Sequence, residues 1–315
     1  AAAGSMRVLS DVVRGRNEWG WGAGVCEGSA AGGRLEVLRW ARENGIPWNE
    51  WTCEAAARGG HLEVLQWARA EGCAWDKNTC LAAARSGNLE VLQWARENGA
   101  PWDERTCMEA ARRGSLEMLR WARENGCPWD KWTCWAAAGG GFLEMLKWAR
   151  GQECPWDEGQ ECPWDEGQEC PWDEGTCRAA AAGGHLEVLK WARENGCPWD
   201  KNTCLEAARG GFLEVLQWAR ENGAPWDERT CMEAARRGSL EMLRWARENG
   251  CPWDKWTCWA AAGGGFLEML MWARENGCPW DEWTCRAAEM GHLEVLKWAR
   301  ENGCPWDKRT FSSSE

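Results

Sequence analysis

The tripeptide Trp-Ala-Arg recurs ten times along this chain at a nearly constant spacing. Most intervals are 27 residues, one is 26 and one is 43. A fixed period of roughly 20 to 50 residues is typical of stacked repeat proteins, in which each unit packs only on its neighbours. The period therefore predicts a solenoid, and it directs the search for function towards a surface. The ten copies begin at Trp40, Trp67, Trp94, Trp121, Trp148, Trp191, Trp218, Trp245, Trp272 and Trp298.

Each repeat has the pattern of two short helices. Thr52 is a favourable N-cap residue, the Ala-rich segment after it favours a helix, and Gly59-Gly60 ends that helix. The wide apolar stripe of Leu62–Ala70 predicts a second helix that is covered on more than one side. In three copies a Glu follows the Thr three residues later, which predicts a capping box. These pairs are Thr106/Glu109, Thr203/Glu206 and Thr230/Glu233.

The loop that closes most copies contains Gly, then Pro, then a second Trp, as in Gly126, Pro128 and Trp129. Gly supplies a left-handed helix end, and Pro cannot continue the helix. Burying a Trp removes about 150–250 Å² from water. At roughly 25 cal/mol per Å² this is about 4–6 kcal/mol before costs are subtracted. We interpret the loop Trp as a wedge that seals the seam between units.

Two larger rearrangements are visible. Residues 76–150 and 200–274 differ at only four of 75 positions, which indicates duplication of a block. The octapeptide Gly-Gln-Glu-Cys-Pro-Trp-Asp-Glu occurs three times in residues 151–174 and explains the interval of 43. Because lengthening a surface loop costs little, we expect an acidic loop here, either a docking tether or a tolerated insertion. We divide the chain into a degenerate N-terminal cap (1–24), repeats (25–150), the acidic octapeptide-repeat loop (151–174) and repeats (175–315).

The charge distribution excludes several classes of partner. The formal net charge is −12, and nine of the acidic side chains lie in residues 151–174, where there is no basic one. The remainder is close to neutral and lacks the basic footprint of a nucleic-acid-binding protein or a polybasic membrane patch. No run of 18 or more apolar residues occurs, so no membrane span is predicted. We expect a cytoplasmic monomer that binds neither nucleic acid nor membrane.

The unit resembles the ankyrin repeat, over residues from about 25 to 310 and most closely in the form of the short, Trp-rich ankyrin-like arrays of protists and large DNA viruses. The resemblance implies an all-α solenoid of about ten ankyrin-like helix pairs. The unit has 27 residues where the family has 33, and the missing ones fall where the family places a β-hairpin. Those hairpins are therefore expected to be missing or reduced. Four segments carry the match: Trp51–Glu54 on Thr-Pro-Leu-His, Ala56-Ala57 on the Ala pair, Gly60-His61 on Gly-His, and Leu62–Leu65 on the second helix.

Three positions of the first helix vary between copies and can share one face, because they lie three or four residues apart. In the second full copy they are Trp51, Glu54 and Arg58. Trp and Arg are enriched in binding hot spots, and the last position matches an inner-face binding position in the family that the unit resembles. We call these positions the stripe and predict that it binds a partner protein; the alternative is packing between units. The predicted partner-binding residues are Trp51, Arg58, Arg85, Arg105, Arg112, Trp132, Trp135, Arg209, Arg229, Arg236, Trp256, Trp259 and Trp283.

Cysteine forms two sets. One follows the Thr, as Cys53 does, at the family's core Leu position, which indicates a buried, reduced thiol. The other lies in the loop, as Cys73 does, and Ile46, Ala100 or Ala224 replaces it in other copies, which indicates a small apolar filler. Neither set has the tight spacing of a zinc site, and helix termination explains the Cys-Pro pairs better than haem ligation does. We predict no metal and no cofactor.

No set of side chains with catalytic spacing is discernible, so the chain is not predicted to be an enzyme. The three histidines lie at the turn between helices and are interpreted as caps: His61, His185 and His292. The leading hypothesis is a non-catalytic protein–protein interaction module that presents a helix-lined repeat surface. The alternative is a rapidly expanding structural array, or the targeting part of a larger adaptor or effector, without a fixed partner.

Overall fold

The computed structural model describes residues 22–151, 169–289 and 291–306. Every regular element in these ranges is a helix, and no strand occurs in them. The all-α prediction is therefore confirmed, and so is the absence of projecting β-hairpins from the described part of the chain. Most of the predicted N-terminal cap (1–24) and most of the acidic loop (151–174) lie outside the described residues.

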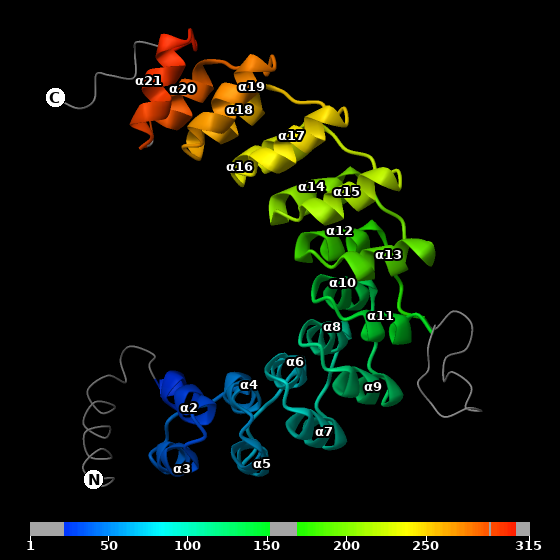
Figure 1. The fold of residues 1–315 in the computed structure, drawn as a ribbon. Coiled ribbons are helices and arrows are strands. Elements are labelled where there is room, and N and C mark those ends of the chain that lie inside the picture. Colours follow the sequence, from blue (N-terminus) through cyan, green and yellow to red (C-terminus); the bar gives the residue numbers. More distant parts are fainter. Residues whose placement is uncertain (1–21, 152–168, 290, 307–315) are drawn as a thin grey trace, which may run out of the picture. The chain divides into compact units, whose positions relative to one another are not determined.

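The chain divides into two compact units, Ala1–Ala137 with Glu144–Pro171 and Ala138–Leu143 with Trp172–Glu315. Within the described residues the helices form pairs in chain order (Figure 1). Up to the first octapeptide they are α2 (Gly22–Ala31), α3 (Leu35–Glu43), α4 (Glu50–Gly59), α5 (Leu62–Ala70), α6 (Lys77–Ser86), α7 (Leu89–Glu97), α8 (Glu104–Arg112), α9 (Leu116–Glu124), α10 (Lys131–Gly139) and α11 (Leu143–Ala149). After the octapeptides they are α12 (Glu174–Gly183), α13 (Leu186–Glu194), α14 (Lys201–Gly210), α15 (Leu213–Glu221), α16 (Glu228–Arg236), α17 (Leu240–Glu248), α18 (Lys255–Gly263), α19 (Leu267–Glu275), α20 (Glu282–Ala288) and α21 (Leu293–Glu301).

Within each unit the even-numbered helices pack side by side: α4 contacts α2 and α6, and α14 contacts α12 and α16. Their contact faces consist of small side chains such as Cys53 and Ala56, which are fully buried and allow close approach. Each odd-numbered helix packs on the even-numbered helix of its own pair, as α5 does on α4. Its apolar stripe, for example Val64, Leu65 and Ala68, fills the space between them. Each repeat is thus a two-helix layer that stacks on the next.

The prediction that Thr caps the first helix is wrong. The N-cap of α4 is Asn49, whose side chain accepts a hydrogen bond from the Trp51 amide at 3.1 Å. In α8 the N-cap is Asp103, and Thr106 lies inside the first turn with its Oγ1 buried and without a hydrogen-bond partner among the described residues. Asx side chains are at least as effective as Thr at this position, so the helix begins earlier than predicted.

The capping boxes are absent for the same reason. Glu109 is 2 % exposed and its Oε1 pairs with Arg85 of the preceding repeat at 3.1 Å. Glu233 pairs with Arg209 of the preceding repeat at 3.5 Å, and Glu206 with Arg209 of its own helix at 2.7 Å. These carboxylates therefore connect neighbouring helices or stabilise one helix surface, and they do not bond back to an N-cap.

The predicted helix ends are confirmed. Gly60 has φ +72° at the C-cap of α4, and Gly126 has φ +81° in the loop after α9, a conformation that favours glycine. His61 occupies the N-cap position of α5, but its side chain makes no capping hydrogen bond. Its Nε2 lies 3.1 Å from the Ala31 carbonyl oxygen of the preceding repeat. The histidine ring therefore joins two repeats, which corrects its interpretation as a cap.

Tryptophan seals the seams, as predicted. Each described loop Trp from Trp48 to Trp280 packs edge-on against the Trp of the next Trp-Ala-Arg tripeptide, with ring centroids 5.7–6.0 Å apart. The arginine of the tripeptide covers the other side of the loop Trp, as Arg42 does over Trp48 at 4.2 Å. Its guanidinium also donates to the loop backbone, from Arg42 Nη1 to the Ile46 carbonyl at 2.7 Å. All three residues of the tripeptide thus have a packing role, since the central Ala41 is fully buried.

Candidate partner-binding surface

The first position of the stripe holds the most exposed aromatic side chains of the even-numbered helices. Trp51, Trp132, Trp256 and Trp283 are 53 %, 48 %, 39 % and 41 % exposed. Each lies in the first turn of its helix, two residues after the N-cap carboxylate or amide whose side chain accepts from its backbone amide. The cap therefore fixes where these indoles emerge. Large exposed indoles are costly to leave in water and are enriched at interfaces.

The second position of the stripe is less open. Trp135 and Trp259 are half-buried and pack edge-on against Trp132 and Trp256, with centroids 5.8 and 5.7 Å apart. Where the same position holds Leu81 or Leu205, the side chain is buried. The two positions of the stripe therefore differ: the indoles of the first position are exposed to solvent, and the side chains of the second position are half-buried or buried beside them.

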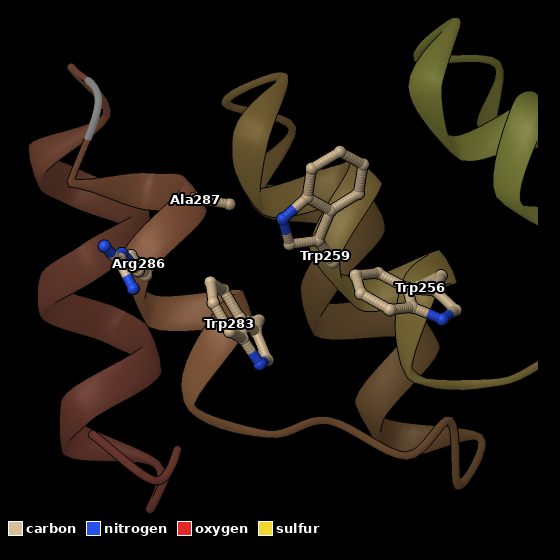
Figure 2. Close-up of a pocket in the computed structure, with 5 residues that line it drawn as sticks. All are labelled: Trp256, Trp259, Trp283, Arg286 and Ala287. Atoms are coloured by element: carbon tan, nitrogen blue, oxygen red, sulfur yellow. The ribbon is translucent and has the colours of Figure 1, made fainter. Parts of the chain in front are cut away.

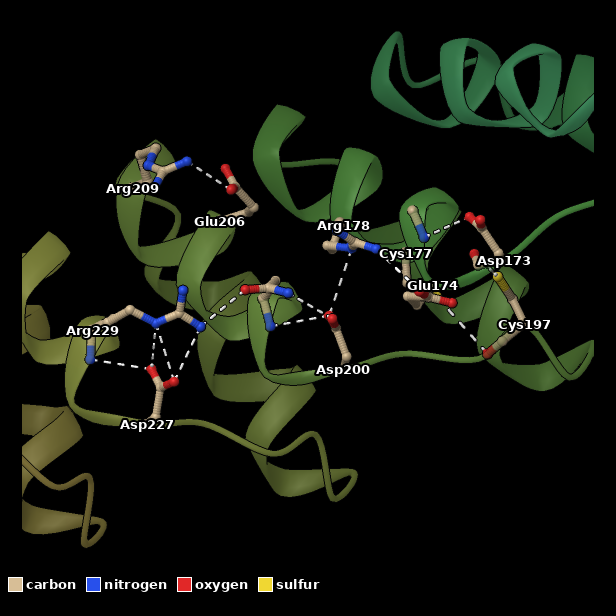
Figure 3. Close-up of polar contacts among 12 residues, drawn as sticks. Asp173, Glu174, Cys177, Arg178, Cys197, Asp200, Glu206, Arg209, Asp227 and Arg229 are labelled. Carbon is tan, nitrogen blue, oxygen red and sulfur yellow. Dashed lines mark hydrogen bonds and ion pairs between the residues drawn. The ribbon is translucent and has the colours of Figure 1, made fainter.

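The predicted arginines of the first position are engaged inside the array. The Arg229 Nη2 atom pairs with Asp227 and donates to Asn202 Oδ1 of the preceding repeat, both at 3.1 Å (Figure 3). Arg105 repeats this arrangement with Asp103 and Asn78 in the other copy of the duplicated block, at 3.1 and 3.4 Å. These two arginines stabilise the contact between repeats.

The arginines of the third position are also paired. Arg209 pairs with Glu206 and Glu233 (Figure 3 shows the first), and Arg236 with Glu233 at 3.4 Å. Three more arginines of this position form ion pairs with carboxylates of their own or a neighbouring repeat: Arg58 with Glu27 and Glu54, Arg85 with Glu109, and Arg112 with Glu109. The charges of these arginines are therefore already compensated within the array.

The N-cap aspartates carry opposite pKa shifts along the surface. Burial alone would raise the pKa of Asp103, but hydrogen bonds from Lys77 and Arg105 outweigh it and hold the pKa below its usual range. Asp130 lacks such donors, so burial and the negative charge of Glu104 raise its pKa. The equivalent residues in the second copy of the block behave alike: the pKa of Asp227 is lowered and the pKa of Asp254 is raised. Trp132 and Trp256 each lie two residues after a cap whose pKa is raised.

A pocket of about 340 Å³ opens between α18 and α20 in the second unit. Its lining consists of three indoles, a methyl group and a guanidinium, from Trp256, Trp259, Trp283, Ala287 and Arg286 (Figure 2). The methyl group of Ala287 points toward Trp259, and the guanidinium carbon of Arg286 lies 5.0 Å from the ring centroid of Trp283. Trp256, Trp259 and Trp283 belong to the predicted set. Arg286 was missed, although it stands at the second stripe position of its repeat.

Arg286 differs from the other arginines of the surface. It is exposed and makes no ion pair with any described residue, including Glu282 one turn earlier. The residue at the same position in α12 is Arg178, which pairs with Glu174 at 3.3 Å and Asp200 at 3.6 Å (Figure 3). The charge of Arg286 is therefore free to act on a bound molecule.

A second pocket of about 340 Å³ lies between α8 and α10 in the first unit. It is lined by Glu104, Arg105, Met108, Asp130 and Trp132. Since Arg105 is already paired with Asp103, the uncompensated charge here is negative. The two pockets differ in sign and in aromatic content although both contain a first-position Trp.

The cysteines lie buried in the described repeats, as predicted. The loop thiol pairs with the core thiol of its own repeat: the hydrogen bond to Cys107 and burial raise the pKa of Cys127 well above its usual range. Cys127 Sγ also lies 3.5 Å from the Asp103 carbonyl oxygen and fastens the loop to the start of α8. No group of three or more His, Cys, Asp or Glu side chains suited to a metal ion occurs in the described ranges.

Comparison with known proteins agrees with this architecture. Residues 29–69 match the family model described as ankyrin repeats in many copies. The chain is therefore similar to ankyrin repeats over this segment, which includes α3, α4 and nearly all of α5. No curated protein matches the chain. Tandem helix-pair folds of this kind build extended binding surfaces and serve as binding or scaffold modules.

Among solved structures, the chain is similar to the pentatricopeptide repeat protein PPR10 in complex with an 18-nt psaJ RNA element, at 15 % identity and a TM-score of 0.49. A Cys-to-Ser variant of PPR10 with the same RNA element gives the same values. In both cases the alignment covers 96 % of this chain and 52 % of the other, so the chain spans about half the length of these structures. Over the described residues, no helix is long and apolar enough to cross a bilayer.

Proposed function

We propose that this chain is a non-catalytic binding module whose even-numbered helices present exposed indoles to a partner protein. The observation that carries the proposal is the exposure of Trp51, Trp132, Trp256 and Trp283 at one equivalent position of four repeats. These four indoles are 39–53 % exposed, whereas the seam indoles are held between neighbouring repeats. Large apolar side chains that are exposed at the same position of several repeats are expected at a contact site, because leaving them in water is unfavourable.

A protein partner fits this surface better than a nucleic acid does. The net charge is −12, and the predicted stripe arginines of the first and third positions are paired with carboxylates among the described residues, which disfavours binding to a chain of phosphates. In this proposal the repeats of residues 25–150 and 175–315 form the binding surface, residues 1–24 form an N-terminal cap, and residues 151–174 form an inserted loop. The proposed setting is a cytoplasmic monomer.

The test compares the proteins captured by the full chain with those captured by a variant in which Trp51, Trp132, Trp256 and Trp283 are replaced by Ala. A matched control replaces Glu90 and Glu117, which are exposed on the odd-numbered helices, by Ala. We expect a specific set of proteins to be lost with the Trp variant, kept with the control and unaffected by ribonuclease. Capture that disappears on ribonuclease treatment would overturn the choice of partner class. An unchanged set with a folded Trp variant would overturn the proposal in favour of a structural array without a fixed partner.

A further inference from the structure

The pocket between α18 and α20 supports a more specific assignment, which rests on the proposed function. Trp256 and Trp259 stand edge-on at 82° with centroids 5.7 Å apart, and Trp283 closes the pocket from the next repeat. The three rings surround one hollow (Figure 2). Its volume of about 340 Å³ is at the lower end of ligand pockets, which span roughly 300–1,000 Å³. It therefore suits a side chain with its neighbour and is too small for a folded surface.

The walls select a planar apolar group. Rings that already meet edge-on leave faces and edges available for a further aromatic ring in the same geometry. Arg236 lies 5.7 Å from the Trp259 ring on the side of α16, but its charge is paired with Glu233 at 3.4 Å. Lys255 lies 5.3 Å from the Trp256 ring and pairs with Asp281 at 2.7 Å. These two cations orient the indoles without adding free charge.

Arg286 supplies the only lining charge of this pocket, and it is positive and unpaired among the described residues. Two carboxyl groups lie near the start of α18: Asp254 is its N-cap, and Glu228 of α16 is close enough for its negative charge, together with burial, to raise the pKa of Asp254. A carboxylate on a bound peptide is thus attracted toward α20 and repelled from α16. The unpaired Arg286 therefore favours a negative group on the partner, placed on the α20 side of the pocket.

We infer that Trp256, Trp259, Trp283 and Arg286 form a specificity pocket for a peptide segment of the partner in which an aromatic side chain is followed by a carboxylate. The aromatic ring enters between the indoles, and the carboxylate accepts from the Arg286 guanidinium. The duplicated block supplies an internal comparison. Trp132 and Trp135 have the same local sequence as Trp256 and Trp259, but the repeat that follows them holds Gly175 where the later copy has Trp283, and Arg178 there is paired.

The experiment titrates the full chain into fluorescein-labelled peptides and measures fluorescence anisotropy. The probe is Gly-Ser-Phe-Asp-Ser-Gly, and the comparison peptides carry Phe-Asn, Phe-Lys or Ala-Asp at its centre. We expect Phe-Asp to bind about tenfold or more tightly than any comparison peptide, and Trp283→Ala to weaken it by a similar factor. Arg286→Glu should lose Phe-Asp and gain Phe-Lys, a reversal that a variant with a damaged fold would not show.

The control variant combines Glu90→Ala and Glu117→Ala, which replace exposed carboxylates of the odd-numbered helices, and should leave the affinity for Phe-Asp within about twofold. Equal binding of Phe-Asp and Phe-Lys, no effect of Arg286→Glu, or equal losses in the control would overturn the assignment. If no peptide binds while protein capture still depends on the exposed indoles, the pocket chemistry is wrong and the proposed function stands. If capture is also independent of the indoles, both fail.

Discussion

The guanidinium carbon of Arg96 lies 4.5 Å from the ring centroid of Trp102, six residues later in the chain. On its other side Trp102 meets Trp121 of the next repeat edge-on at 5.8 Å. Each seam indole is thus held between a cation of its own repeat and an indole of the next. This relationship explains why Trp, Ala and Arg recur together, because only the complete tripeptide builds both sides of the contact.

Replacement of this arginine should weaken the seam. Arg96→Ala removes the stacked guanidinium and the hydrogen bond from Arg96 Nη1 to the Ala100 carbonyl at 3.1 Å. We expect a loss of about 2 kcal/mol in the free energy of unfolding, measured by urea denaturation followed by far-UV circular dichroism. The neighbouring exposed Glu97→Ala serves as a control and should change little. Equal, small effects of the two variants would show that the stacking does not stabilise the seam.

Seam and surface indoles should respond very differently to truncation. Trp102→Ala opens a cavity between two repeats and should cost about 3–5 kcal/mol. Trp51→Ala removes a side chain that is 53 % exposed and should stay within about 1 kcal/mol of the parent chain. Urea denaturation of both variants measures the difference. A large loss for Trp51→Ala would mean that this indole packs in the fold and is not available for a partner.

The two kinds of N-cap aspartate should give opposite pH profiles. The lowered pKa of Asp103 means that its ionised form stabilises the fold above its unfolded value of about 3.9, and that this contribution is lost as the pH falls through the folded pKa. Asp103→Asn keeps a good cap and should cost up to about 1 kcal/mol near neutral pH. The loss should vanish in acid.

Asp130 is the matched comparison, because its raised pKa means that folding opposes its ionisation. Asp130→Asn should therefore leave the stability near neutral pH unchanged or slightly higher. Thermal unfolding of both variants across a series of acidic buffers measures the two profiles. Parallel profiles for the two variants would contradict the assigned difference between Lys77 beside Asp103 and Glu104 beside Asp130.

The buried threonine hydroxyls offer a stabilising substitution. Thr106 Oγ1 is buried without a hydrogen-bond partner among the described residues, and such a group costs about 1–3 kcal/mol of desolvation. Thr106→Val keeps the branched shape and removes the hydroxyl, so we expect stability to be equal or up to about 1 kcal/mol higher. Thermal denaturation checks this. A clear loss of stability would show that the Thr106 hydroxyl makes a hydrogen bond in the folded protein, in partial agreement with its predicted role as a cap.

The loop cysteines should be replaceable, and the buried thiols of both cysteine sets should be unreactive. Cys127→Ala should change the free energy of unfolding by less than about 1.5 kcal/mol, because the chain itself holds Ala100 at the equivalent position. Burial raises the pKa of Cys80 to about 12, so its thiol should stay protonated and resist alkylation near neutral pH in the folded protein. Mass spectrometry after iodoacetamide treatment, with and without denaturant, measures this. Rapid labelling of the folded chain, or a melting temperature raised by zinc, would contradict the role of the thiols as core fillers.

The repeat period and the turn residues were enough to predict the stacked helix pairs, the helix Leu62–Ala70 and the Trp contacts between repeats. These features could be predicted because they depend on contacts that recur in every copy. The N-caps were misassigned because Thr and Asx compete for the same role within four residues, and only the tertiary packing that buries Thr106 decides between them. The pairing of Arg85 with Glu109, 24 residues later, could not be predicted from the sequence, because it depends on how neighbouring helices are rotated relative to each other. The same holds for Arg286 beside Trp283. The sequence by itself determined that the repeats stack, because the same apolar pattern recurs in every copy. Only the tertiary structure decided which charged side chains form ion pairs between repeats and which indoles remain exposed, because both depend on how neighbouring helices face one another.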